Sequence, residues 1–191
     1  MAAAMAMQCS RSGAETLLID LAGDQPELLG VPSPDVGVTD WLGGIDVPLD
    51  GLAALELDVA PHLRLLARGG LPADTRLDVL ARVCAASSRT VIVDAGVAAD
   101  VHWAGGCAEE IVVVRACYLA VRRTGTLPSR ARLVVIEEPG RALRADDVAT
   151  AVGVPVWRRL VLDPAVARSV DAGLLSSRLP RSLRTLDPLA S

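Results

Sequence analysis

The sequence predicts an α/β fold: a mostly parallel, doubly wound sheet with flanking helices. Two observations support this fold class. Short aliphatic and β-branched runs alternate along the chain with segments of helical periodicity, and the runs are apolar throughout, as strands are when both faces of a sheet are covered. With 191 residues, 51% of them hydrophobic, the chain can form one sizeable core. We therefore expect a single domain over residues 1–191.

The strands are expected where Val, Ile and Leu follow one another between turn-forming residues. Strong β propensity and the absence of internal charge are typical of strands in the middle of a parallel sheet. In chain order, the compact apolar runs are residues 16–20 (TLLID), 90–94 (TVIVD), 110–115 (EIVVVR) and 132–136 (RLVVI). Residues 63–66 and 156–162, which contain internal arginines, are two further candidates.

Helices are expected in the intervals between these strands. Shorter helices are predicted at residues 145–152 and 164–172, and the first thirteen residues, rich in Ala and Met, also have helical character. The longest periodic segment is 74–86, which places four side chains on one helical face: Leu77, Leu80, Ala81 and Cys84.

Two segments are expected to lack regular structure. Residues 30–51 are rich in Pro, Gly and Asp and predict a surface loop. The end of the chain, 180–191, predicts a frayed tail. It carries Arg and Leu in alternation, but Pro180 and Pro188 interrupt any amphipathic helix, so membrane association is not expected.

Composition excludes several function classes. The net charge is −4, so no overall basic field attracts nucleic acid, and with 2% aromatic residues and no Phe the chain lacks base-stacking platforms. We expect nucleic acid to be reached only indirectly. The four cysteines have no metal-like spacing, which favours reduced thiols in the cytoplasm.

Acidic residues end two of the predicted strands. Ligands of a parallel sheet gather beyond the carboxyl ends of its strands, where Asp20 and Asp94 are placed. Asp94 precedes Ala95 and Gly96, an arrangement in which a carboxylate can hold a magnesium-bound water beside a turn. The alternative is that both acids only cap helices or turns. A third acidic strand end, Glu137 with Glu138, is better explained as solvated charge.

Taken in order, four segments resemble the MinD/ParA family of dimerising, deviant Walker ATPases in the P-loop superfamily. TLLIDLAGD resembles the family's second strand and first switch, and TVIVDAG its Walker B strand. EEIVVVRACYLAVRRT and LVLDPAVARSVDAGLL resemble later strand and helix pairs. The resemblance implies a P-loop NTPase-like fold, magnesium at Asp94, and five cofactor-binding residues: Asp20, Asp24, Asp94, Gly96 and Asp163.

Four departures limit what the resemblance implies. All 19 basic residues are Arg, so neither the P-loop lysine nor the signature lysine of the family is present. Met1 begins within what resembles the family's first helix, so the first strand and phosphate loop are missing. Ala22 stands where the family often has a second acid, and Glu137 and Glu138 replace an adenine-contacting Asn. We therefore assign no catalytic residue and do not expect this chain to hydrolyse ATP.

The missing strand has a structural consequence. In the family it lies inside the sheet, so its loss leaves buried backbone groups unpaired, each at a cost of about 1–3 kcal/mol. We expect an apolar gap beside the strand that ends at Asp94, and a chain that depends on a partner or on an upstream segment for solubility. ATP and magnesium are expected as cofactors only if an upstream P-loop exists, and otherwise none.

Two classes of function follow. The first is a nucleotide switch for intracellular positioning, in cell division at a septum or in chromosome partitioning, working as a homodimer or with a protein partner. The second is a nucleotide-free pseudoenzyme that keeps a partner surface as a scaffold. A small-molecule ligase of the same superfamily is a further alternative. An in-frame glycine-rich segment encoded upstream of Met1 would favour the switch.

Overall fold

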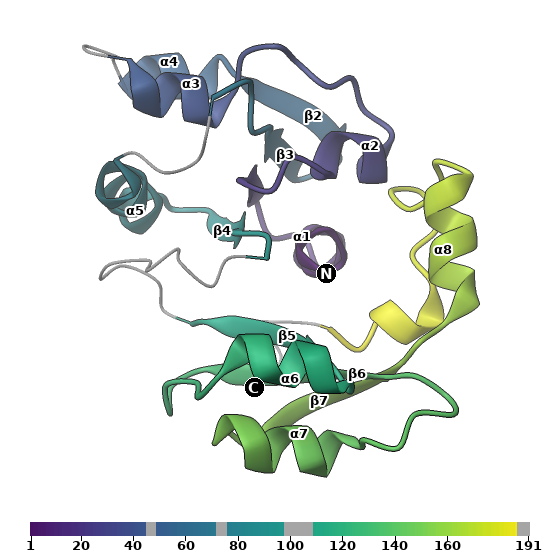
Figure 1. Cartoon of the computed structure of the whole chain (residues 1–191). Coiled ribbons are helices and arrows are strands. Elements are labelled where there is room, and N and C mark those ends of the chain that lie inside the picture. The colour runs from purple at the N-terminus through teal and green to yellow at the C-terminus, as the bar shows by residue number, and fades with distance from the viewer. Residues whose placement is uncertain (45–48, 72–75, 98–108, 187–191) are drawn as a thin grey trace. The chain divides into compact units, whose positions relative to one another are not determined.

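A computed structural model describes residues 1–44, 49–71, 76–97 and 109–186 of the chain (Figure 1). The chain divides into two compact units. The first comprises Met1–Gly106 and Ala165–Ser191, and the second comprises Cys107–Pro164. Each unit has its own sheet and its own hydrophobic cluster. The single domain expected over residues 1–191 stays a prediction.

The first unit is built on a four-stranded sheet in the order β2-β3-β1-β4. Its central strand β1 (Thr16–Asp20) is parallel to β3 (Leu63–Leu66) and to β4 (Thr90–Asp94). The remaining strand, β2 (Glu56–Ala60), is antiparallel to β3. All five residues of β1 are buried, as predicted for an uninterrupted apolar run.

The sequence did not predict β2. Its residues, ELDVA, alternate acidic and apolar side chains and are half-buried or exposed, which is the pattern of an edge strand. At the other edge, β4 pairs with β1 alone among the described residues. This is the strand beside which the sequence predicts a gap, and that expectation stays a prediction.

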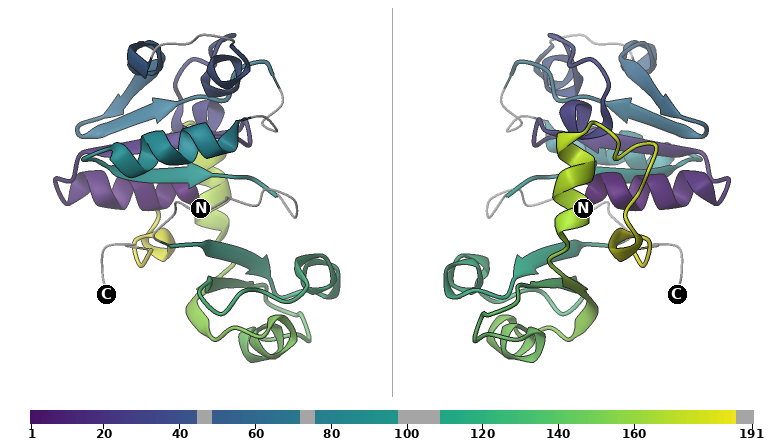
Figure 2. Two further views of the ribbon diagram at one scale, coloured as in Figure 1. Left: turned by 90° about the vertical axis from the view of Figure 1, so that its left-hand side faces the viewer. Right: turned by 90° about the vertical axis from the view of Figure 1, so that its right-hand side faces the viewer.

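Helices lie on both faces of this sheet (Figure 2). On one face, α1 (Ala2–Arg11) packs against β1, β3 and β4, and its small side chains are buried around most of its circumference. Its Ala and Met residues allow close approach to the strands. The other helical segments of the unit are α2 (Gln25–Leu29), α3 (Val38–Gly43), α4 (Leu49–Ala53), α5 (Leu77–Ala86), α8 (Pro164–Asp171), which begins at the unit boundary, and the 3-10 turn η1 (Arg181–Leu183).

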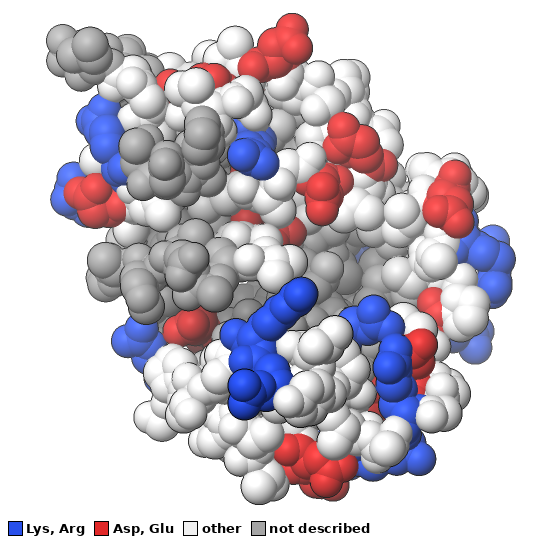
Figure 3. Space-filling model, viewed as in Figure 1, with Lys and Arg blue, Asp and Glu red and all other residues white. Residues whose placement is uncertain are grey.

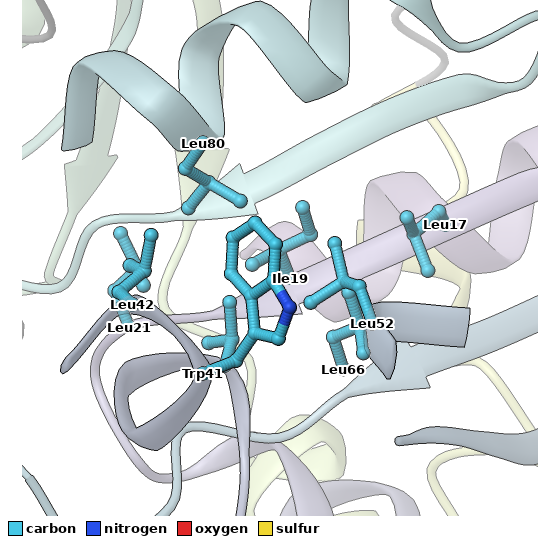
Figure 4. Packing of buried hydrophobic residues seen from close by; sticks show 9 residues of the cluster. Leu17, Ile19, Leu21, Trp41, Leu42, Leu52, Leu66 and Leu80 are labelled. Carbon is cyan, nitrogen blue, oxygen red and sulfur yellow. The ribbon is translucent and has the colours of Figure 1, made fainter. Parts of the chain in front are cut away.

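The opposite face of the sheet carries the main hydrophobic cluster, centred on Trp41 (Figure 4). Side chains of β1 and β3 meet those of α3 and α5 there. This corrects the prediction of a loop over residues 30–51, because α3 lies inside that range. Its buried residues Val38, Trp41 and Leu42 follow helical spacing, which the surrounding Pro and Gly concealed.

The Asp40 side chain caps the start of α3 and fixes it to the loop that follows β3. The Asp40 carboxylate accepts hydrogen bonds from the Gly37 N–H at 2.9 Å and from the Gly70 N–H at 3.0 Å. Gly69 has φ +88°, and a Cβ there would lie 1.9 Å from Asp40 Oδ2. Residue 69 must therefore be glycine for both conformational and steric reasons.

We expect Gly69→Ala to lower the free energy of unfolding by about 2–3 kcal/mol, because it combines a strained φ with a collision at Asp40. Gly13 is a matched control, since it has the same φ of +88° with nothing within 4 Å of the added Cβ. Gly13→Ala should cost only about 1 kcal/mol. Urea denaturation of both variants measures the difference, and equal losses would show that the contact with Asp40 is not the cause.

The second unit is a three-stranded parallel sheet in the order β5-β6-β7. Its strands are β5 (Ile111–Arg115), β6 (Arg132–Glu137) and β7 (Val156–Val161), with helices α6 (Tyr118–Thr124) and α7 (Ala145–Val152). Leu133, Val134 and Val135 of the central strand are fully buried. The predicted α/β class with mostly parallel sheets flanked by helices is confirmed, although the described strands form two sheets.

The structure describes part of the segment that the sequence predicts to be a frayed tail, and that expectation stays a prediction. Of the predicted frayed tail, residues 180–186 are described, and they include η1 and a fully buried Leu186. Gln8 of α1 donates a hydrogen bond to the Arg184 carbonyl at 2.7 Å. Residues 187–191 lie outside the described part. Within the described residues, no helix has the length and apolar character needed to cross a membrane.

Candidate functional site

Asp20 and Asp94 lie side by side at the carboxyl ends of β1 and β4. The two strands are parallel over their full length, and the register pairs Thr16 with Thr90 at one end and Asp20 with Asp94 at the other. This confirms the prediction that both acids lie at the same edge of one sheet. It is also the edge at which parallel sheets bind ligands.

The Asp20 carboxylate holds the loop that follows β1. Its Oδ1 accepts hydrogen bonds from the backbone N–H groups of Ala22 at 3.0 Å and Gly23 at 2.7 Å, and its Oδ2 from that of Gln25 at 3.0 Å. The residue has no exposed surface. Burial raises the pKa of this carboxyl above its ordinary value, while the three N–H donors act in the opposite direction. Asp20 is therefore an anchor for the loop.

The Asp94 carboxylate accepts two hydrogen bonds within the described residues, and the Met1 ammonium interacts with it electrostatically. Oδ1 accepts a hydrogen bond from the Gly96 N–H at 2.9 Å, and Oδ2 accepts one from the Gln25 side-chain Nε2 at 2.5 Å. Gly96 has φ +70°, and a Cβ there would lie 3.1 Å from the Ala22 Cβ. Gly96 thus allows the turn after β4 to approach the loop after β1 closely.

Gln25 joins the two acids and was not predicted. Its backbone N–H bonds to Asp20 and its side-chain amide bonds to Asp94, while only 1% of the residue is exposed. Among the described residues, its Oε1 is a buried acceptor without a hydrogen-bond partner. The sequence held one hint of this role. The chain has only two glutamines, Gln8 and Gln25, and Gln25 lies in the segment that follows the strand ending at Asp20.

Arg68 is a second residue that sequence reasoning missed. Its guanidinium donates a hydrogen bond to the Ala22 carbonyl at 3.3 Å, and its Nε is the other buried side-chain polar atom without a partner in the described part of the chain. Because a guanidinium stays protonated, Arg68 places a positive charge beside the loop that Asp20 anchors. No lysine is available for that purpose.

The remaining predicted residues differ in their surroundings. Asp24 is exposed at the start of α2 and makes no side-chain capping bond there. Asp163 lies in the second unit, between the end of β7 and the start of α8. Glu137 accepts a hydrogen bond from the Ala145 N–H at 2.8 Å at the start of α7. The pKa of Glu138 is lowered by Arg141 and Arg115, which both bond to its carboxylate.

The sequence predicts magnesium at Asp94, and that expectation stays a prediction. Mg²⁺ is usually held by one or two carboxylates together with waters. Asp94 supplies one carboxylate, but the side chain of Gln25 presents its amide nitrogen to it, and the Met1 ammonium interacts electrostatically with the same carboxylate. No group of three or more His, Cys, Asp or Glu side chains within the described residues could hold a metal. Such a site would therefore rely on water ligands.

A surface hollow of about 390 Å³ lies at the other end of the same sheet. Its lining includes Glu15, just before β1, and the β2–β3 connection with His62. The His62 Nδ1 lies 2.5 Å from the Glu15 carboxylate. Because this hollow is at the amino end of β1, it is separate from the site at Asp20 and Asp94.

The two units differ in the balance of their basic and acidic residues. Cys107–Pro164 contains nine arginines and seven acidic residues, against ten and sixteen in the rest of the chain. Several arginines of the second unit are ion-paired, and basic and acidic side chains are interspersed on the face seen in Figure 3. The expectation that nucleic acid is reached only indirectly stays a prediction.

Comparison with family models and with curated protein sequences gave no match. Solved structures do match. A ParA family ATPase from Chlorobium tepidum TLS aligns with a TM-score of 0.76 at 18% identity, covering 97% of this chain and 89% of that one. The MinD cell division protein of Aquifex aeolicus aligns with a TM-score of 0.69 at 14% identity, covering 96% and 85%. A MinC:MinD cell division protein complex from the same organism aligns with a TM-score of 0.65 at 18% identity, covering 90% of this chain and 79% of that one. The chain therefore has a ParA/MinD-like fold.

Proposed function

We propose that this chain is a MinD/ParA-like nucleotide-switch relative that acts in intracellular positioning, either at a septum or in chromosome partitioning. The observation that carries the proposal is the in-register pair Asp20 and Asp94, joined through Gln25 at the ligand-binding edge of the sheet. The ParA and MinD structures with the same fold support it. The MinC:MinD complex supports a protein partner as the means of action, and a homodimer is the alternative.

We assign a different role at the site to each of these residues. Asp94 would hold a magnesium ion together with waters, and the charge of that ion would offset that of nucleotide phosphates. Asp20 holds the loop in place, Gly96 allows the close turn, and exposed Asp24 partly replaces the acid absent at Ala22. In the second unit, Asp163 follows the strand whose loop is expected to contact adenine. ATP binding requires a P-loop in addition.

The absence of lysine favours a second candidate, a partner-binding scaffold that does not use nucleotide. Phosphoryl transfer in P-loop proteins relies on a lysine that reaches the β- and γ-phosphates, and Arg does not replace it conservatively. We therefore expect no ATP hydrolysis by the purified chain above that of buffer. Calorimetry with Mg-ATP should show binding weaker than micromolar, and micromolar, magnesium-dependent binding would contradict this expectation.

Localisation of a fluorescent fusion in the source cell separates the two candidates. A positioning role predicts foci at the septum or over the chromosome, and Asp94→Asn should disperse them if a cation-dependent switch is needed. Asp35→Asn is the matched control, because Asp35 is an exposed acid between α2 and α3 to which no role at the site is assigned. Foci that persist in Asp94→Asn would favour the scaffold. A uniform distribution of the wild-type fusion would contradict positioning altogether.

A further inference from the structure

The outer side of α6 exposes two large apolar side chains. Tyr118 is 67% exposed and Leu119 is 63% exposed. The other side of the helix, with Ala120 and Val121, packs against the hydrophobic cluster of the second unit. Within the described part of the chain, α6 therefore has one packed side and a second apolar side that stays open to solvent.

Two exposed arginines lie beside these apolar side chains. Arg122 follows Tyr118 by four positions and Arg123 follows Leu119 by four, so each arginine neighbours one of them on the helix surface. Among the described residues, neither arginine takes part in an ion pair, whereas five other arginines of the second unit do: Arg115, Arg130, Arg132, Arg141 and Arg159. Figure 3 shows basic side chains over α6.

This composition is that of a protein contact surface. Tyr and Arg are enriched among the residues that contribute most binding energy at interfaces. A guanidinium also bonds carboxylates in a planar, two-pronged geometry. Since α6 contains no acidic residue of its own, its arginines are available to carboxylates from elsewhere. The basic surface of α6, made of Tyr118, Leu119, Arg122 and Arg123, therefore fits an acidic partner surface.

A surface of opposite charge lies on α2 of the same chain. Asp24 and Glu27 are exposed at the start of this helix, while Pro26 and Leu29 are buried, so the acids face outward. Within the described residues, neither acid is in an ion pair. Figure 3 shows acidic side chains over α2. The acidic surface of α2 thus offers two unpaired carboxylates to the two unpaired arginines of α6.

We propose that a second copy of this chain docks the acidic surface of its α2 on the basic surface of α6. Each copy carries both surfaces, so two copies related by a two-fold axis can make the contact twice. Choosing a second copy rests on the homodimer alternative of the proposed function, but neither magnesium nor a P-loop takes part. Because α2 and α6 are short, the contact is small, and the dimer is weak and sensitive to salt.

Charge reversal tests the contact in sedimentation experiments on the full chain without nucleotide. We expect wild type to form a dimer whose fraction grows with protein concentration and falls as salt is added. Arg122→Glu with Arg123→Glu reverses the surface of α6, and Asp24→Arg with Glu27→Arg reverses that of α2. Each double variant alone opposes like charges, so its Kd for self-association should rise at least about tenfold.

Mixing the two double variants restores opposite charges at both contacts of a mixed dimer. The new acids on α6 of one variant face the new arginines on α2 of the other, and the second contact keeps the wild-type charges. We expect the mixture to dimerise as wild type does, a recovery that neither misfolding nor a contact within one chain would produce. Arg130→Glu with Arg144→Glu is the matched control, because it makes the same change of charge at exposed residues outside α6 and should leave the Kd unchanged.

The outcomes separate the docking contact from the proposed function. A wild-type chain that stays monomeric overturns the second copy as the partner, while the positioning role is tested separately by the foci of the fluorescent fusion. A wild-type dimer that survives both reversals, or that the mixture fails to restore, overturns the contact between α2 and α6. Should either double variant lose its far-UV circular dichroism, Arg123→Glu and Glu27→Arg are mixed in the same way and decide the matter.

Discussion

Asp20→Ala should lower the free energy of unfolding by about 3–5 kcal/mol. The substitution removes one side chain and leaves three backbone N–H groups, those of Ala22, Gly23 and Gln25, without their acceptor. A hydrogen bond to a charged group contributes about 1.5–3 kcal/mol, and buried unpaired donors add their desolvation cost. Part of the loss will be recovered where water reaches the loop, which keeps the expected total below the sum of three bonds.

The matched control is Asp24→Ala, four residues further along the same loop. Asp24 is exposed and its side chain does not cap α2, so the substitution should change stability by no more than about 0.5 kcal/mol. Asp20→Asn should fall between the two, because Asn keeps one acceptor oxygen but turns an NH₂ group toward the Gln25 N–H. Urea denaturation at neutral pH measures all three. Equal stability of Asp20→Ala and Asp24→Ala would show that the loop does not depend on Asp20.

The sequence predicted the strands best where a run of residues is apolar without interruption. The runs TLLID and TVIVD are uninterrupted and apolar, so their positions as strands and the placement of Asp20 and Asp94 at the same edge of a mostly parallel sheet could be inferred before the fold was known. The direct pairing of β1 with β4 comes from the structure alone. The fold class followed from the same runs.

Features that depend on a single contact were not predictable. The edge strand β2 carries alternating charge, and α3 is only six residues long within a Pro- and Gly-rich segment. Gln25 and Arg68 matter because of where the loop places them, and an isolated polar residue gives no periodic signal. Tertiary packing, rather than local propensity, determines these parts of the site.

Trp41→Ala should lower the free energy of unfolding by about 3–5 kcal/mol, the usual cost of removing a large aromatic side chain from a core. Trp41 is 6% exposed and its ring lies among side chains of β1, α3 and α5 (Figure 4). Trp41→Phe keeps a ring in the same place and should lose about 1–2 kcal/mol. Chemical denaturation followed by far-UV circular dichroism compares the two variants with wild type, and equal losses would contradict a packing origin.

The same variant tests the prediction that residues 1–191 form one domain. Trp41 lies in the first unit, whereas the buried centre of the second is β6, with Leu133, Val134 and Val135. In a single cooperative domain, weakening the Trp41 cluster lowers hydrogen-exchange protection in β1 and β6 together, because both open only by global unfolding. We expect this joint loss in Trp41→Ala under native conditions. Protection lost in β1 but kept in β6 would show that the two units are separate domains, each with its own stability.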